Sequence, residues 1–285
     1  MKWEEGREEG IEDRRGLSTG HYVGGGGVAV IVIALIGYFF FGIDPSKILG
    51  AADSLDSAQI SAPSNVGLTT PTDPQGKFAA TIFTSADDTW ADLFAKQGKA
   101  YHRPTMVLYS GGTTTACGEG QSAMGPFYCP DDEKIYLDLD FFQTLDQQLG
   151  APGDFAKSYV IAHEFGHHIQ KLLGVSDAVS AKEQRLSEAG ANALSVKLEL
   201  QADCYAGVWA KQSNKKMDWI EAGDIDEALN AAAAVGDDTL QKETQGTVVP
   251  DSFTHGTSAQ RQHWFKSGYD SGDPASCDTF GAGGI

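Results

Sequence analysis

Two histidines and a glutamate in the sequence HEFGH, residues 163–167, have the spacing of a metal site on a helix. His163 and His167 stand four positions apart, so on an α-helix both imidazoles face one side and can bind one ion. Glu164 lies about 100° around the helix from His163, beside the ion but outside its ligand set. A carboxylate there can take a proton from a zinc-bound water and pass it to a leaving amine. The pattern predicts a zinc hydrolase; accidental spacing of surface or core residues is the alternative.

A third ligand is needed, because catalytic zinc takes three protein ligands and keeps one position open. Glu199 and Asp203 are again four positions apart, in a segment from 187 to 212 that reads as a helix. We expect Glu199 to bind the metal and Asp203 to accept the distal N–H of a ligand histidine, which fixes the tautomer of that histidine. The alternative is a solvated acidic helix face.

Four stretches together resemble one known family. HEFGHHIQ at 163–170, ELQADCYAGVW at 199–209, VVPDSFTHGTSAQR at 248–261 and the leader WEEGREEGIEDRRG at 3–16 are similar to the neutral zinc metallopeptidase family of bacterial membrane-anchored proteins. The resemblance implies a zincin-like fold, a zinc cofactor (Zn²⁺) and peptidase activity. It also implies His163, His167 and Glu199 as metal ligands and Glu164 as the base.

His255 is a further candidate for catalysis. It lies in a loop before a predicted helix that begins at about residue 257, and functional side chains are common in such loops. From there an imidazole could donate to the oxyanion of a tetrahedral intermediate. An exposed or locally hydrogen-bonded loop histidine is the alternative. His168 points to another helix face than His167 and is expected to support the site or to pack.

The remaining patterns predict an α+β domain, mostly helical, with a small β-sheet. Short strands are expected at 104–109 and 134–138, and helices at 78–97, 139–149, 154–173, 188–212, 225–235 and 258–267. Asp154 is expected to cap the metal-binding helix, and Gly174 to end it. One peptidase domain at 76–280 accounts for these elements, with a short tail at 281–285.

An uncharged, apolar run predicts a single transmembrane helix at 23–43. Residues 24–43 supply 20 residues, about the 30 Å of a hydrocarbon core. Four basic residues precede the run and only Lys47 closely follows it, so the leader at 1–22 should stay in the cytosol. The peptidase domain would then be extracytoplasmic, joined through a flexible linker at 44–75. A cleaved signal peptide and a buried core helix are the competing interpretations.

Four cysteines follow the apolar run, as an oxidising compartment would allow. Cys117 and Cys129 would close a short loop and leave Cys204 to pair with Cys277, although four cysteines allow three pairings. Cys204 as a metal ligand is the alternative, and in a cytosolic domain free buried thiols would be expected.

A net charge of −18 argues against a nucleic-acid partner, because phosphate binding needs clustered Lys and Arg that this sequence does not show. The sequence therefore predicts a membrane-anchored zinc metallopeptidase that acts on peptides or proteins. The competing hypothesis is a non-catalytic zinc-binding scaffold, a pseudo-protease that works through partner binding.

Overall fold

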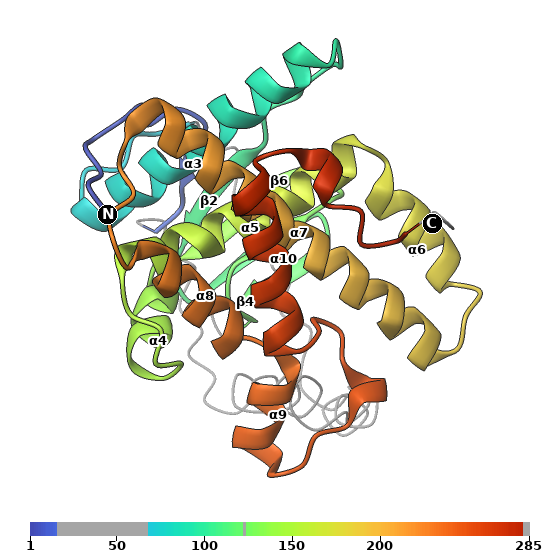
Figure 1. Cartoon of the computed structure of the whole chain (residues 1–285). Coiled ribbons are helices and arrows are strands. Elements are labelled where there is room, and N and C mark those ends of the chain that lie inside the picture. Colours follow the sequence, from blue (N-terminus) through green and yellow to red (C-terminus); the bar gives the residue numbers. More distant parts are fainter. Residues whose placement is uncertain (16–67, 122–123, 282–285) are drawn as a thin grey trace, which may run out of the picture.

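The computed structural model describes residues 1–15, 68–121 and 124–281, and in them helices outweigh two small sheets (Figure 1). This confirms the mostly helical α+β class. The strands are β1 (Ile11–Asp13), β2 (Thr105–Tyr109), β3 (Gly112–Thr115), β4 (Gly118–Gln121), β5 (Phe127–Cys129) and β6 (Lys134–Asp138). The helices are α3 (Pro74–Lys96), α4 (Asp140–Gln147), α5 (Asp154–Leu172), α6 (Val175–Glu183), α7 (Glu188–Met217), α8 (Asp224–Ala234), α9 (Asp237–Gln245) and α10 (Ser258–Ser271), with short 3-10 turns at Pro250–Ser252 and Pro274–Ser276.

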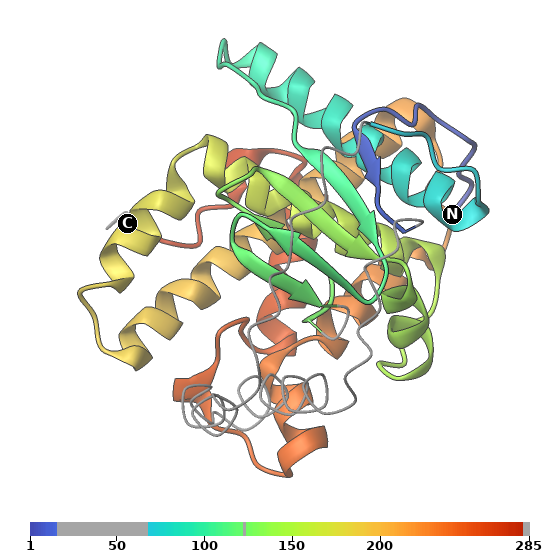
Figure 2. The same cartoon turned by 180° about the vertical axis from the view of Figure 1, so that it is seen from behind.

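The larger sheet has the strand order β1-β2-β6-β5 and covers one side of the helices (Figure 2). β1, β2 and β6 are parallel, and β5 runs antiparallel to β6. The two strands predicted from apolar β-branched and aromatic residues are β2 and β6, which pair in the middle of the sheet. β1, β5 and the antiparallel hairpin of β3 and β4 were not predicted.

The predicted helices are all present, with shifted ends, and α6 and α9 are additional. The expected cap of α5 was wrong: Gly153 is the N-cap residue and Asp154 lies in the first turn. The backbone N–H of Phe155 instead donates to Glu227 of α8, with 3.0 Å between N and Oε2. Gly174 follows the C-cap with a φ of +74°, as predicted for the residue that ends this helix. A carboxylate from a distant helix thus satisfies the start of α5.

α7 and α10 approach closely because each has a glycine at the contact. A Cβ placed on Gly207 would lie 2.0 Å from the carbonyl oxygen of Phe265, and one on Gly268 would lie 1.9 Å from that of Cys204. No larger residue fits at either position without separating the helices. The glycines therefore set the distance between α7 and α10, which both contribute to the site described below.

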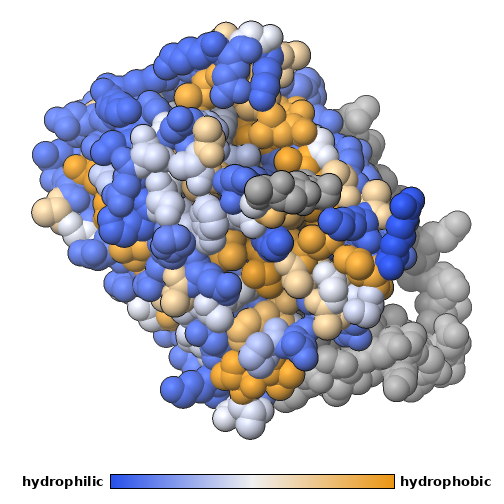
Figure 3. Space-filling view, turned by 45° about the vertical axis from the view of Figure 1, so that its right-hand side comes forward, coloured by the Kyte–Doolittle hydropathy of each residue, from blue (hydrophilic) through white to orange (hydrophobic). Residues whose placement is uncertain are grey.

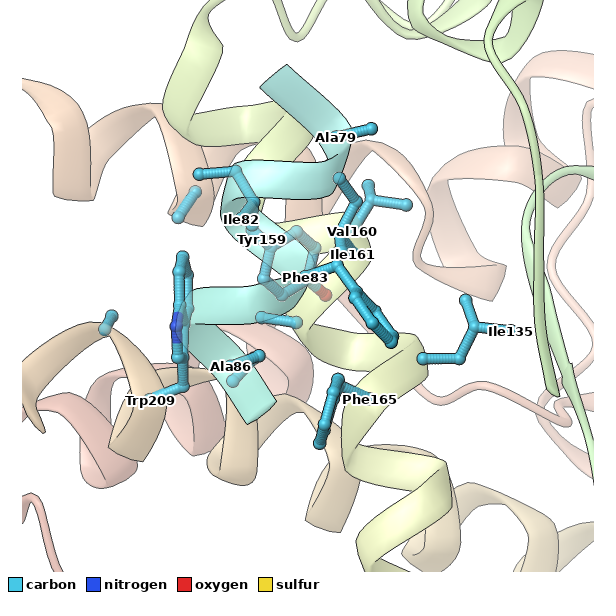
Figure 4. Packing of buried hydrophobic residues seen from close by; sticks show 14 of the residues in the cluster. Ala79, Ile82, Phe83, Ala86, Ile135, Tyr159, Val160, Ile161, Phe165 and Trp209 are labelled. Carbon is cyan, nitrogen blue, oxygen red and sulfur yellow. The ribbon is translucent and has the colours of Figure 1, made fainter. Parts of the chain in front are cut away.

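The hydrophobic core joins α3, α5 and α7 (Figure 4). Phe83 of α3 and Phe165 of α5 have ring centroids 5.6 Å apart, and Phe155 of α5 stacks on Trp209 of α7 at 6.1 Å. All four side chains are fully buried. The face shown in Figure 3 is mixed, with hydrophilic side chains over much of it and apolar patches among them.

Two disulfides confirm the predicted cysteine pairing. Cys117 bonds to Cys129, and Cys204 bonds to Cys277. The second bridge ties α7 to the segment after α10. Because Cys204 is engaged in it, the alternative of a metal-binding Cys204 is wrong.

The leader and the end of the expected linker belong to the folded domain. β1 pairs with β2, and Ile11 is fully buried. Thr69 hydrogen-bonds to Ile11, and α3 begins at Pro74, so the domain includes residues that the sequence assigned to the linker. The transmembrane helix predicted at 23–43 lies outside the described residues. Among the described helices, none combines the length and the apolar character needed to cross a bilayer.

Candidate metal centre

Three side chains from two helices converge on one point. His163 and His167 extend from α5 and Glu199 from α7, and their donor atoms lie within 4.8 Å of one another. The two Nε2 atoms are 3.2 Å apart, and the Glu199 carboxylate oxygens lie 3.1 Å from His163 Nε2 and 3.4 Å from His167 Nε2. A tetrahedral zinc ion with ligands at about 2.0–2.1 Å holds its ligand atoms about 3.3–3.4 Å apart. The residues therefore fit a zinc ion in spacing and in chemical type.

The charges around these three residues favour a cation. Burial alone would lower the pKa of His163, but the carboxylates of Asp203 and Glu199 raise it to about 10. Burial would likewise raise the pKa of Glu199, but His167 and His163 hold it well below its usual range. A buried carboxylate facing two imidazoles is stable only with positive charge beside it. A divalent metal supplies that charge without protonating the histidines.

Asp203 lies where the sequence predicted a support for a ligand histidine. His163 Nδ1–H donates to Asp203 Oδ1 at 2.8 Å, which leaves Nε2 for the metal. The hydroxyl of Tyr159 donates to the same oxygen at 2.5 Å. Asp203 is fully buried, so these bonds hold the His163 ring in one orientation.

Arg261 of α10 completes this arrangement and was not identified from the sequence. Its Nε donates to Asp203 Oδ2 at 2.9 Å and its Nη2 to Asp203 Oδ1 at 3.0 Å, a two-pronged ion pair. The residue is only 3% exposed. Its signal in the sequence was its place at the end of the 248–261 motif, but nothing local related it to Asp203, 58 positions earlier.

Gln170 plays the corresponding part for His167, and it too was missed. The Nδ1–H of His167 donates to Gln170 Oε1 at 2.9 Å, while the Gln170 amide donates to the carbonyl of Leu198 at 2.6 Å. Gln170 closes the 163–170 motif, one helical turn after His167. Gln170 therefore links the orientation of His167 to the backbone of α7 next to Glu199.

Glu164 is buried in the same region, at 8% exposure. The pKa of its carboxyl is raised, mainly because the group is buried. The negative charge of Glu199 raises this pKa further, whereas His163 and His167 lower it. A raised pKa makes a carboxylate a better proton acceptor near neutral pH. Its carboxyl is therefore a buried candidate proton acceptor whose charge interacts with all three donors.

His255 is held beside the centre by Asp237, which the sequence did not single out. Asp237 Oδ2 accepts the backbone N–H groups of Thr254, His255 and Gly256 at 2.8, 2.6 and 2.9 Å. Its Oδ1 lies 3.2 Å from His255 Nδ1. Burial would lower the pKa of His255, but the hydrogen bond with Asp237 and the nearby charge of Glu199 raise it. The imidazole is 39% exposed, so a substrate could reach it.

His168 packs and takes no part in the centre. Its ring donates to the carbonyl of His102 at 2.8 Å and accepts from the Tyr128 hydroxyl at 3.1 Å. Burial lowers the pKa of His168 to about 4, so the ring stays neutral. It fastens α5 to the edge strand β5.

Gly166 allows α5 and α7 to bring their ligands together. A Cβ at this position would lie 3.0 Å from both the Cα and the carbonyl oxygen of Ala202. Any side chain here would separate the two helices by a few tenths of an ångström, and the Glu199 carboxylate would move from the histidines with them. Gly166 is therefore needed for the close packing of α5 against α7 at the site.

Comparison with known proteins points to a zinc-binding family, in agreement with the three converging donors. The family described as "Putative neutral zinc metallopeptidase" matches residues 1–280. "Uncharacterized protein YpfJ" of Escherichia coli (strain K12) is 48% identical over 292 residues, covering 99% of this chain and 99% of that protein. "Uncharacterized protein Rv2575" of Mycobacterium tuberculosis (strain ATCC 25618 / H37Rv) is 49% identical over 208 residues, covering 70% of this chain and 68% of that protein. No solved structure gives a significant match. The chain belongs to the neutral zinc metallopeptidase family.

Proposed function

We propose that this protein is a zinc-dependent peptidase that hydrolyses peptide bonds at the centre formed by His163, His167 and Glu199. The observation that carries the proposal is the convergence of these three donors beside the buried carboxylate of Glu164. A helix that carries two ligands and the base, packed between a mixed sheet and a second helix with the third ligand, supports a zincin-like fold. Bound zinc would acidify water and polarise the substrate carbonyl.

The residues of the chain divide the remaining work. Glu164 accepts the proton of the attacking water and returns it to the leaving amine. His255 has its Nδ1–H turned to Asp237, and its raised pKa favours the protonated ring. In that form Nε2–H can donate to the developing oxyanion of the substrate. Asp203 and Gln170 hold the ligand imidazoles in the tautomer that leaves Nε2 for the metal.

The decisive experiment compares the protein with its Glu164→Gln variant. Zinc content is measured together with cleavage of a peptide library, with chelator and with zinc added back. We expect both proteins to bind one zinc and only the parent to cut; Glu188→Gln, an exposed change on α7, is the matched control that should keep full activity. Zinc binding without cleavage by the parent protein would favour the scaffold hypothesis. Undiminished turnover by Glu164→Gln would refute Glu164 as the base.

A further inference from the structure

The first fifteen residues are built into the sheet of the peptidase domain. Ile11, Glu12 and Asp13 pair in parallel with Met106, Val107 and Leu108 of β2. The backbone N–H of Met106 donates to the carbonyl of Gly10 at 2.9 Å, and that of Arg14 donates to the carbonyl of Leu108 at 2.7 Å. Ile11 is fully buried in the main core. This strand shares its hydrophobic core with the helices of the domain.

The leader also contacts α3 along several turns. The ring of Trp3 meets Phe78 edge to face, with centroids 5.1 Å apart. The backbone N–H of Gly6 donates to the Thr81 hydroxyl at 3.1 Å, and the ammonium of Lys77 lies 3.0 Å from the carboxylate of Glu5. These apolar, hydrogen-bonded and charged contacts come from separate residues, so the leader is held along its length.

Residues 69–73 also contact the leader. The backbone N–H of Thr69 donates to the carbonyl of Ile11 at 2.8 Å, and that of Asp13 donates to the Thr69 hydroxyl at 3.1 Å. The guanidinium of Arg15 lies 2.6 Å from the carboxylate of Asp73, the N-cap residue of α3. Thr69 and Asp73 therefore lie beside β1 and its immediate continuation, Arg15.

We propose that residues 1–15 and 68–281 occupy the same compartment, with the leader as a permanent strand of the peptidase domain. A single crossing would place about 30 Å of hydrocarbon between the two ends. A hydrogen bond of 2.8 Å between Thr69 and Ile11 cannot span that layer. The proposal opposes the topology expected from the basic leader, a cytosolic leader with an extracytoplasmic domain.

Cysteine labelling of the full chain in intact cells tests the compartments directly. Glu4→Cys in the leader and Lys215→Cys near the end of α7 are both exposed, and neither position makes a described contact. The four native cysteines are paired in disulfides. A membrane-impermeant maleimide is applied before and after permeabilisation to each single-cysteine variant. We expect the two positions to behave alike, both labelled before permeabilisation or both only after it. Labelling of one from outside and of the other only after permeabilisation would overturn the proposal.

A cross-link tests the docked strand itself. Glu5→Cys with Lys77→Cys replaces an exposed ion pair, and a protease site is inserted in the stretch 44–67. After treatment with a short bismaleimide and cleavage at that site, the leader should stay attached to the domain on a denaturing gel. The control pairs Glu5→Cys with Lys182→Cys on α6. Helix α6 lies on the side of the molecule away from the N-terminus in both Figure 1 and Figure 2. We expect leader retention at least fivefold above that control. Equal retention in the two pairs, with all cysteines reactive, would contradict a docked leader.

Discussion

Replacing Asp203 with asparagine should weaken zinc binding and destabilise the fold, and the two effects have separate causes. The side chain keeps its shape but loses the charge that accepts from His163 Nδ1 and pairs with Arg261. Removal of such a support for a ligand histidine typically costs a factor of about 10–100 in metal affinity, which corresponds to about 1.4–2.7 kcal/mol. The loss of stability is larger, because Arg261 is 3% exposed. An uncompensated buried charge costs about 3–5 kcal/mol.

The assay measures both quantities on the same proteins. Zinc affinity comes from competition with a chelating dye, and the free energy of unfolding of the zinc-free protein comes from denaturant titration. Asp226→Asn, at an exposed position of α8, is the matched control and should change neither by more than about 0.5 kcal/mol. The variant that combines Asp203→Asn with Arg261→Met removes both charges. It should recover much of the stability lost in the single variant, since the unpaired cation is gone.

Two results would refute this reasoning. Unchanged zinc affinity in Asp203→Asn would show that the negative charge of Asp203 is not needed to hold the His163 ligand. A double variant as unstable as the single one, with the same unfolding cooperativity, would show that the cost does not come from the buried charge of Arg261.

Three further predictions concern other parts of the molecule. Asp237→Asn should lower kcat about 10²–10³-fold, the usual cost of losing one oxyanion donor, with zinc content unchanged, because His255 loses its support; equal kcat in the variant would remove His255 from the mechanism. Ile11→Ala should cost about 2–5 kcal/mol of unfolding free energy in denaturant titration, since the side chain is fully buried. Leu68→Ala, at 67% exposure, should cost less than about 0.5 kcal/mol, and similar losses for both would argue against a docked leader. Burial would raise the pKa of Glu12, but hydrogen bonds from Arg14 and Lys134 lower it in the folded chain. The unfolded state therefore binds the proton more readily, so the contribution of Glu12 is full above its unfolded pKa of about 4.3 and is lost as pH falls through the folded value. Unfolding measured against pH should show a shallower acid loss for Glu12→Gln, and parallel curves would contradict this.

The sequence was informative wherever a local rule applies. Ligands four residues apart on one helix share a face whatever surrounds them, so the HEFGH spacing predicted the pairing of His163 with His167 before any fold was known. The same rule, applied to Glu199 and Asp203, placed both on the side of α7 that meets α5. Strands β2 and β6 were recognised for the same reason, because a short run of apolar, β-branched and aromatic residues is itself the signal.

Local rules failed where distant residues replace a local partner. The start of α5 was assigned to Asp154, but Glu227 of α8 satisfies the backbone there. β1 was read as part of a separate leader because its pairing partner lies almost a hundred residues away. α6 and α9 are short and polar, with few apolar positions to indicate a buried face.

By itself the sequence predicted zinc, the ligands His163, His167 and Glu199 and the base Glu164, since these predictions depend on residue type and helical spacing. The sequence also predicted the support from Asp203, but only the tertiary structure showed which distant residues hold Asp203 and His255 in place. Arg261 reaches Asp203 because the glycines between α7 and α10 let those helices touch, and Asp237 reaches His255 because α9 folds back on its loop. Such contacts arise from the packing of segments far apart in the chain, and no periodicity within one segment encodes them.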